Sequence, residues 1–282
     1  MDVNILDKIV LTKKKEILQR SAGAPIGELR KRPFYNRDCL SLKPFLMDAD
    51  KTGIIAEFKR KSPSKGQINE HAGVIEVTAA YNRHGASALS VLTDREYFGG
   101  DTNDLTTARV IPLPILRKDF IIDEYQVEET KAMGADLILL IAACLKPEEV
   151  KKLAALAHGL GMEILLEIHN REELNHLCGE IDYVGVNNRD LKTFTVDVNR
   201  SVELSEAIPP GIIKIAESGI SQASTIQMLR RYGYLGFLMG ENFMKEPDPA
   251  IAFASFVNEL KKQPYEGKSL RHDATGPGQK AG

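Results

Sequence analysis

Residues 54–66 read Ile-Ile-Ala-Glu-Phe-Lys-Arg-Lys-Ser-Pro-Ser-Lys-Gly, a short apolar strand that ends in charge and leads into a polar loop. A strand buried on both faces of a parallel sheet is normally an almost continuous apolar run. This one carries Glu57 and Lys59 two positions apart, and because strand side chains alternate, both point to the same side. Buried charge is costly unless it is paired or used, so the pair indicates either a structural ion pair or part of a functional site.

From residue 53 onward, short apolar runs alternate with amphipathic segments, which is typical of repeated strand–helix units. The predicted strands are Ile54–Lys59, Ala88–Leu92, Pro114–Lys118, Asp136–Ile141, Glu163–Ile168, Tyr183–Asn188, Ile212–Glu217 and Leu235–Gly240. Each interval leaves room for one helix and short loops. Such a series of units predicts a single (β/α)8 barrel, the TIM-barrel fold, over residues 51–262.

Several intervals carry clear helix signals. Glu124–Met133 has an acidic first turn, and Pro147–Leu160 begins with proline at its first position and ends at Gly161. Ser221–Arg231 opens with a serine that can cap it and closes with basic residues. A doubly wound nucleotide-binding sheet is the alternative architecture, but its glycine fingerprint is missing, because the nearest glycine pair follows a helix and precedes a strand.

The two ends of the chain stand outside this pattern. In residues 1–50, apolar residues such as Ile5 and Ile9 recur at helical spacing, which predicts a helical extension that packs on the barrel and caps one end. The basic run Lys13–Lys15 is predicted to be a solvated face of that helix. Residues 263–282 are polar, rich in Gly, Lys and Pro, and without periodicity, so we expect a disordered tail.

The amino-acid composition limits the classes of protein to which the chain can belong. The chain has 282 residues, 43% of them hydrophobic, and a formal net charge of −2, so no basic excess suggests nucleic acid as a partner. Cys39, Cys144 and Cys178 lie far apart, which argues against a disulfide framework or a zinc knuckle and fits a reducing cytoplasm. No apolar stretch resembles a signal peptide or a membrane span, so we expect a cytoplasmic globular protein.

Polar residues at the carboxyl ends of the predicted strands are the candidates for chemistry, because the active site of such a barrel lies there. The ionisable candidates are Glu57, Lys59, Lys118, Glu167 and Glu217. A lysine in an apolar or cationic site acquires a lowered pKa, and a buried glutamate a raised one, so the set suits proton transfer. Metal ligation is not expected, because the histidines are scattered, and we interpret the nearest, His169, as a loop residue.

Small residues after the last two predicted strands indicate a phosphate site. Ser218-Gly219 and Gly240-Glu241 occupy the loops that bind phosphate through backbone N–H groups in many barrels of this kind. Ser62 and Ser64 offer further hydroxyls near the first strand. Glu241 can serve there only through its backbone N–H, with its acidic side chain turned away.

Five stretches resemble the signature sequences of the indole-3-glycerol phosphate synthase family, in the same order along the chain. They are Ile55–Ser64, Ser90–Asp94 with Tyr97-Phe98, Leu116–Phe120, Asn187–Leu191 and Ala216–Ile220. The resemblance implies a lyase that converts 1-(2-carboxyphenylamino)-1-deoxyribulose 5-phosphate to indole-3-glycerol phosphate in tryptophan biosynthesis. Carbon dioxide and water would be lost, and no cofactor would be needed.

The resemblance also implies roles for individual residues. Lys118 resembles the general acid for ring closure, Glu167 its acid/base partner, and Lys59 the lysine that engages the substrate and assists dehydration. Glu57 and Asn187 would orient these catalytic groups. The remaining positions fall into two sets: Ser62, Pro63, Phe98, Phe120, Arg189 and Glu217 would line the substrate site, with the phenylalanines on the aromatic ring, and Ser218, Gly219, Gly240 and Glu241 would hold the phosphate.

Other functions remain open from the residues alone. A Schiff-base aldolase could use Lys118 or Lys214 as its nucleophile. Phosphoribosylanthranilate isomerase, another barrel of the pathway, would need a cysteine or similar group on the first strand, and this strand has none. A non-catalytic phosphate-ligand binder is the third alternative. We expect the chain to be a monomer that makes at most transient contacts with other tryptophan-pathway enzymes, and to bind neither nucleic acid nor a membrane.

Overall fold

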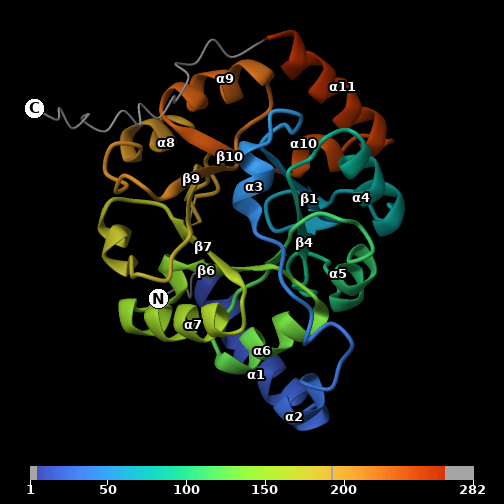
Figure 1. Ribbon diagram of the computed structural model, residues 1–282, viewed down its shortest axis with the longest axis vertical. Coiled ribbons are helices and arrows are strands. Elements are labelled where there is room, and N and C mark those ends of the chain that lie inside the picture. The colour runs from blue at the N-terminus through green and yellow to red at the C-terminus, as the bar shows by residue number, and fades with distance from the viewer. Residues whose placement is uncertain (1–4, 192, 264–282) are drawn as a thin grey trace, which may run out of the picture.

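The computed structural model describes residues 5–191 and 193–263, and within them parallel strands close into a barrel with helices outside (Figure 1). The hydrogen-bonded order is β1-β10-β9-β8-β7-β6-β5-β4, and β4 pairs with β1 to close the ring. The barrel strands are β1 (Ile54–Phe58), β4 (Ala88–Leu92), β5 (Ile115–Lys118), β6 (Leu137–Ile141), β7 (Glu163–Ile168), β8 (Tyr183–Asn187), β9 (Ile213–Glu217) and β10 (Tyr234–Met239). The predicted (β/α)8 barrel is confirmed, and each predicted strand lies within one residue of its observed bounds at either end.

Helices cover the outside of the barrel. The α-helices are α1 (Ile5–Gly23), α2 (Ile26–Leu29), α3 (Leu42–Met47), α4 (Val74–Arg83), α5 (Thr102–Ala108), α6 (Glu124–Met133), α7 (Pro147–Gly159), α8 (Asn199–Leu204), α9 (Ala223–Arg231), α10 (Glu241–Met244) and α11 (Pro249–Lys262). Two 3-10 helices, η1 (Ala142–Cys144) and η2 (Glu172–His176), lie in the loops after β6 and β7. A small hairpin of β2 (Lys61–Ser62) and β3 (Gly66–Gln67) forms the loop after β1.

Two details of the helices differ from the sequence prediction. The connection from β7 to β8, residues 169–182, contains the short 3-10 helix η2 and no α-helix. Helix α9 begins at Ala223 with Gln222 as its N-cap and without a side-chain cap hydrogen bond. The predicted capping role of Ser221 is therefore wrong.

Hydrophobic burial is divided between two layers. Side chains such as Ile55, Leu139 and Leu238 pack inside the barrel, whereas Ile54, Val91 and others pack between the strands and the helices. This alternation follows from the period of two along each strand. The interior is therefore filled largely by apolar side chains below the carboxyl ends of the strands.

Helix α3 closes the end of the barrel where the strands begin, and it lies over the barrel in Figure 1. Leu42 and Leu46 pack into the same cluster as the interior residue Ile55. The carboxylate of Glu163, at the start of β7, accepts a 2.7 Å hydrogen bond from the Leu42 N–H and one of 2.8 Å from the Tyr183 hydroxyl. These contacts hold the helix against the barrel end.

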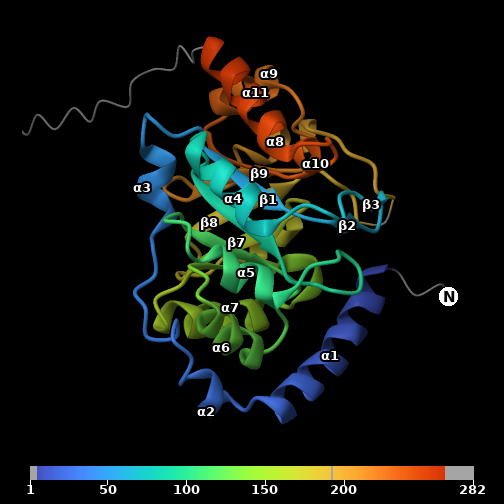
Figure 2. The same cartoon turned by 90° about the vertical axis from the view of Figure 1, so that its right-hand side faces the viewer.

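Helix α1 runs along the side of the barrel toward the opposite end, where the β2–β3 hairpin lies (Figure 2). Its basic run is not uniformly solvated. Lys14 and Lys15 are exposed, but Lys13 is only 1% exposed and lies 2.6 Å from Asp94 and 3.0 Å from Asp119. The prediction of a solvated face is wrong for Lys13, because carboxylates on two distant loops of the barrel compensate its burial.

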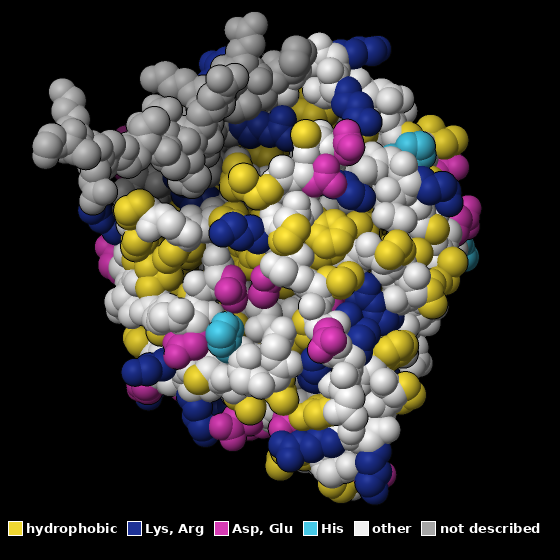
Figure 3. All heavy atoms as spheres, viewed as in Figure 1, with side chains coloured by type: hydrophobic (Ala, Val, Ile, Leu, Met, Phe, Trp, Pro, Cys, Tyr) yellow, Lys and Arg dark blue, Asp and Glu magenta, His cyan; other side chains and the backbone are white. Residues whose placement is uncertain are grey.

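The face of the molecule shown in Figure 3 carries charged side chains of both signs. Basic and acidic side chains are largely interspersed on this face. No helix within residues 5–191 and 193–263 has both the length and the apolar character needed to cross a bilayer. The predicted tail falls almost wholly on residues 264–282, which lie outside the described residues.

Candidate active site

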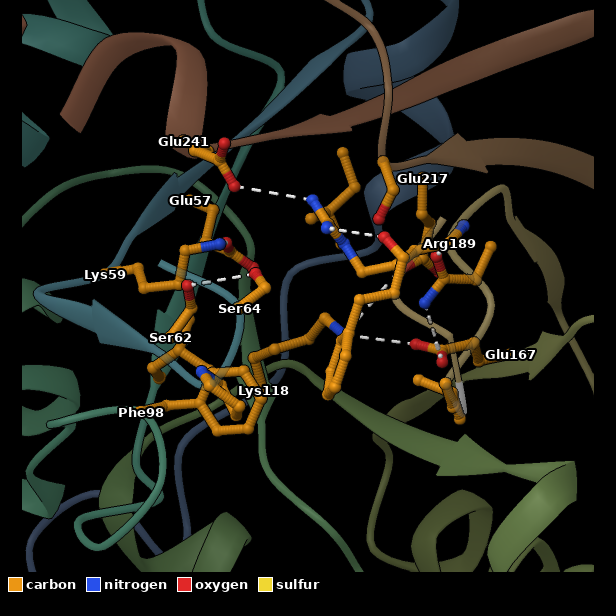
Figure 4. A pocket seen from close by; sticks show the side chains of 18 of the residues that line it. Glu57, Lys59, Ser62, Ser64, Phe98, Lys118, Glu167, Arg189, Glu217 and Glu241 are labelled. Atoms are coloured by element: carbon orange, nitrogen blue, oxygen red, sulfur yellow. Dashed lines mark hydrogen bonds and ion pairs between the residues drawn. The ribbon is translucent and has the colours of Figure 1, made fainter. Parts of the chain in front are cut away.

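A cavity of about 500 Å³ opens at the carboxyl ends of the barrel strands (Figure 4). It is lined by residues from the loops after β1, β4, β5, β8, β9 and β10, together with the first turns of α1. All the site residues suggested by sequence lie in its wall: Glu57, Lys59, Ser62, Pro63, Phe98, Lys118, Phe120, Glu167, Asn187, Arg189, Glu217, Ser218, Gly219, Gly240 and Glu241. The fold thus brings together groups that are far apart in the chain.

Lys118 lies at the centre of the charged groups. Its Nζ donates a 3.1 Å hydrogen bond to Glu167 Oε2 and lies 3.6 Å from Glu217 Oε2. Alternation along β5 explains this direction, because Lys118 points into the barrel while its neighbour Arg117 points outward and is completely buried against α6. The ammonium therefore sits between two carboxylates from β7 and β9.

These charges shift one another's protonation. Burial alone would lower the pKa of Lys118, but the carboxylates of Glu167 and Glu217 raise it above its ordinary value. Burial alone would raise the pKa of Glu167, but the Lys118 ammonium and His169 hold it well below its usual range. For Glu217, burial and the Glu167 charge raise the pKa to about 8. The site therefore holds a charged lysine, a charged glutamate and a glutamate that exchanges its proton near neutral pH.

The pair noted on the first strand is also intact. Lys59 Nζ lies 2.7 Å from Glu57 Oε1, and both side chains are largely buried in the cavity wall. The short distance follows from their common side of β1. Two lysine–carboxylate pairs, Lys59 with Glu57 and Lys118 with Glu167, therefore stand on different strands around one space.

Asn187 connects this charged centre to the loop after β8. Its Nδ2 donates a 3.0 Å hydrogen bond to Glu167 Oε1, and its Oδ1 accepts one of 3.0 Å from the Arg189 N–H. The Arg189 guanidinium in turn contacts Glu241 Oε2 at 3.4 Å. The Glu241 carboxylate thus turns toward the Arg189 guanidinium, whose positive charge offsets the negative charge of this carboxylate.

Aromatic and hydroxyl groups form another part of the cavity wall. The rings of Phe98 and Phe120 are tilted by 40° with centroids 5.9 Å apart. Ser62 Oγ lies 3.4 Å from Ser64 Oγ in the loop that contains the hairpin. This part of the wall offers two aromatic rings and two hydroxyls to a ligand.

Small residues are required at the ends of β9 and β10. Ser218 and Gly219 both have positive φ, 65° and 75°, and a side chain at Gly219 would come within 2.4 Å of Val196. At Gly240, a Cβ would lie 2.7 Å from the Glu57 Cβ. Packing therefore leaves no room for a side chain at either glycine, and the backbone of both residues lies in the cavity wall.

Two contributions to the site are not evident from the sequence. His169, interpreted only as a loop residue, follows β7 directly, and its Nε2 lies 3.4 Å from Glu167 Oε1 while its Nδ1 lies 3.3 Å from Glu173. Burial opposes its charge, but these carboxylates raise its pKa to about 9. Ile5 and Ile9 of α1 also line the cavity. Their helical spacing was visible in the sequence, but the end of the barrel that α1 reaches was not.

The described residues contain no cluster of three or more His, Cys, Asp or Glu arranged to hold a metal ion. The cavity combines ammonium groups, carboxylates, an aromatic wall and two tightly packed glycines at strand ends. Fold and site together are those of a TIM-barrel enzyme with acidic and basic groups gathered in one cavity at the carboxyl ends of its strands.

Comparison with known proteins identifies the family. Residues 6–256 match the family model described as indole-3-glycerol phosphate synthase. The chain therefore belongs to the indole-3-glycerol phosphate synthase family, the carboxy-lyases of tryptophan biosynthesis. It is 45% identical to the indole-3-glycerol phosphate synthase of Bacteroides thetaiotaomicron, with 91% of this chain and 99% of that protein aligned. The enzyme of the same name from Chromobacterium violaceum is 44% identical, over 89% and 97% of the two chains.

Solved structures with lower sequence similarity share the fold. A 3-hexulose-6-phosphate synthase from Salmonella typhimurium superposes with a TM-score of 0.59 at 11% identity, over 74% of this chain and 98% of that one. A mandelate oxidase also gives a TM-score of 0.59, at 14% identity over 74% and 72%. At such identities the likeness concerns the barrel architecture alone.

Proposed function

We propose that this chain closes the indole ring of indole-3-glycerol phosphate from 1-(2-carboxyphenylamino)-1-deoxyribulose 5-phosphate, with loss of carbon dioxide and water. Membership of the family supports the overall reaction. The observation that carries the assignment of residues is the contact of the Lys118 ammonium with Glu167 and Glu217 inside one cavity. The cavity also holds an aromatic wall on one side and glycine-rich strand ends on another.

Binding at both ends would fold the flexible substrate. The phosphate would lie against Ser218, Gly219 and Gly240, where the backbone is accessible, and the carboxyphenyl ring would lie against Phe98 and Phe120. The ketone carbon of the sugar chain is then held beside the ring carbon that carries the carboxylate. Such positioning lowers the barrier to cyclisation, because the substrate has already lost its conformational freedom when it binds.

Lys118 would act as the general acid in the first step. The ring carbon bonds to the ketone carbon while the ammonium gives its proton to the carbonyl oxygen, which becomes a hydroxyl. Lys118 is a charged ammonium because the carboxylates of Glu167 and Glu217 raise its pKa above its ordinary value, although burial alone would lower it. The charge also stabilises the negative charge that develops on the oxygen.

Loss of carbon dioxide follows from the same intermediate. The bond between the ring carbon and its carboxylate breaks, and the electron pair returns to the ring. Lys59, paired with Glu57 at 2.7 Å, stands where it can contact the carboxylate or the sugar hydroxyls. We assign Glu57 and Asn187 the role of orienting Lys59 and Glu167 respectively, because each makes a direct contact with its partner.

Dehydration completes the indole. The new hydroxyl leaves as water with a second proton, which the Lys59 ammonium would supply, and Glu167 takes the proton from the carbon beside the nitrogen. Glu217, with a pKa raised to about 8 by burial and by the Glu167 charge, can exchange protons with the pair Lys118–Glu167. Arg189 would hold the loop after β8 over the substrate through Glu241.

The aldolase alternative is less well supported. A Schiff-base nucleophile must be a neutral amine, whereas the carboxylates beside Lys118 favour its ammonium form despite burial. Lys214 does not line the cavity, because its Nζ donates to the carbonyl oxygens of Ser205 and Tyr232 at 3.0 and 2.6 Å. A non-catalytic binder would have no need for two opposed lysine–carboxylate pairs in one cavity.

A direct assay tests the proposal. The protein is mixed with the carboxyphenylamino-deoxyribulose phosphate, and product is followed by indole fluorescence and by carbon dioxide release. The chain contains no tryptophan, so its own emission arises from tyrosine and leaves the indole signal clear. We expect one carbon dioxide per indole formed. Tight binding of the substrate without either product would support the binder instead.

A further inference from the structure

Lys13 is the most deeply buried lysine of α1, and it lies outside the set of groups that would touch the substrate. Its Nζ lies 2.6 Å from Asp94 Oδ2, 3.0 Å from Asp119 Oδ1 and 3.0 Å from Glu16 Oε2. Asp94 and Asp119 are almost completely buried as well. An ammonium has three N–H donors, so one carboxylate is available for each of them.

The two aspartates also hold the backbone of the loops that follow β4 and β5. Asp94 Oδ1 accepts hydrogen bonds from the N–H groups of Tyr97 and Phe98 at 2.8 and 3.0 Å. Asp119 Oδ1 accepts one of 2.8 Å from the N–H of Phe120. Each carboxylate therefore fixes the backbone of one of the two phenylalanines that form the aromatic wall.

We propose that Lys13 is a positioning residue, which sets the aromatic wall of the cavity by joining α1 to Asp94 and Asp119. The ammonium contacts both of these aspartates and so bridges the two loops. Phe98 and Phe120 owe their 5.9 Å separation to the positions of those loops. This inference rests on the proposed function for the identity of the ring that the wall receives.

Helix α1 contributes to the same wall. Ile9 lies one turn before Lys13 on the same face of the helix, and Ile5 lies one turn earlier, and both line the cavity. The Thr12 hydroxyl lies 3.0 Å from the Tyr97 hydroxyl, which gives a second contact between α1 and the loop after β4. Figure 2 shows α1 rising along the barrel to this end. Anchoring by Lys13 thus also sets where the apolar side chains of α1 lie.

The charge balance of this cluster makes Lys13 difficult to replace. Asp119 has a second partner in Arg117, whose Nη2 lies 3.1 Å from its Oδ2, and that oxygen also accepts a 2.6 Å hydrogen bond from Thr93. For Asp94, Lys13 is the only cation within ion-pair distance among the described residues. Removal of Lys13 would leave buried negative charge beside the backbone of Phe98, and the loop after β4 would move to solvate it.

The test separates binding of the ring from binding of the phosphate. Lys13→Met removes the charge and keeps the length of the side chain, and Lys14→Met, on the exposed side of the same helix, is the matched control. Two ligands are titrated: a substrate analogue in which the ketone is reduced to an alcohol, and D-ribulose 5-phosphate, which has the phosphate and no ring. We expect Lys13→Met to weaken the analogue about tenfold and to leave ribulose phosphate within twofold.

Other results would overturn the inference. Analogue affinity within twofold of the unmodified protein, or an equal loss for both ligands, would show that Lys13 has no selective effect on the ring site. If Lys13→Met yields no folded protein, K13M/D94N is used, because the asparagine Oδ1 still accepts from Tyr97 and Phe98 without a buried charge. We expect the double variant to show the same selective loss of affinity for the analogue. If its affinities for both ligands equal those of the unmodified protein, the role of Lys13 is refuted. Failure of the proposed function would appear separately, as absence of turnover in the unmodified protein.

Discussion

The ammonium of Lys118 donates a 3.1 Å hydrogen bond to Glu167, although 49 positions separate the two residues in the chain. The contact spans from β5 to β7 across the mouth of the barrel. It keeps both groups charged in a buried site, which is the condition for a lysine that gives up a proton only when substrate charge develops beside it. Because this contact keeps Lys118 protonated, it favours the proposed acid catalysis over nucleophilic attack by a neutral amine.

This distinction predicts the outcome of chemical trapping. With borohydride present, incubation with the ketone substrate is expected to leave Lys118 unmodified, because its ammonium has no lone pair for attack on the carbonyl. Peptide mass spectrometry after digestion measures the adduct. A stoichiometric reduced adduct on Lys118 would favour the aldolase mechanism over the one proposed here.

Substitution of Gly219 is expected to weaken binding of the phosphate end. Gly219→Asp adds a negative charge beside the proposed phosphate site, and any Cβ there meets Val196 and requires a φ of 75°. We expect KM to rise about a hundredfold, with Gly219→Ala, which adds the steric strain without the charge, giving a smaller rise. Steady-state kinetics of both variants measure the difference. Equal KM values for the two variants would show that charge at this position has no role.

The pKa of His169 predicts a pH dependence of stability. Burial opposes its charge, but Glu167 and Glu173 raise the pKa from 6.5 to about 9 in the folded protein. A raised pKa means that the stabilisation is complete below pH 6.5 and is lost as pH rises toward 9. We expect His169→Gln to lower the free energy of unfolding by on the order of 1–3 kcal/mol at pH 6 and by much less at pH 9.5.

Urea unfolding of both proteins at pH 6 and pH 9.5 measures that change. Glu217, whose pKa is raised to about 8 by burial and by the Glu167 charge, is present in both proteins, so its own titration largely cancels in the difference. An identical loss of stability at the two pH values would contradict a charged His169.

Much of the barrel and its site was predictable from local pattern. Apolar runs of strand length and the residues that end them fix each strand, and parallel strands of a closed barrel must present their carboxyl ends at one rim. Lys59, Lys118 and Glu167 could therefore be assigned to one site from their positions at strand ends. The pairing of Glu57 with Lys59 follows equally from the two-residue period.

Other contacts depend on packing that no local pattern encodes. Lys13 sits in a run of three lysines, and only the docking of α1 on the barrel decides which of them is buried between Asp94 and Asp119. Nothing in the sequence distinguishes His169 from an ordinary loop residue. Its positive charge depends on the contact with Glu173, which only the folded loop brings about. The expectation that a lysine of the site has a lowered pKa is also wrong for Lys118, because two carboxylates raise its pKa by more than burial lowers it.

The central claim is that Lys118 supplies the proton for ring closure, and the most direct measurement compares turnover and binding in Lys118→Met. We expect kcat to fall by about a thousandfold or more, with the affinity for the reduced analogue within about tenfold of the unmodified protein. Lys152→Met, which removes a lysine from an exposed surface pair with Glu124, serves as the control and should leave both values unchanged. Turnover of Lys118→Met close to that of the control would contradict the account.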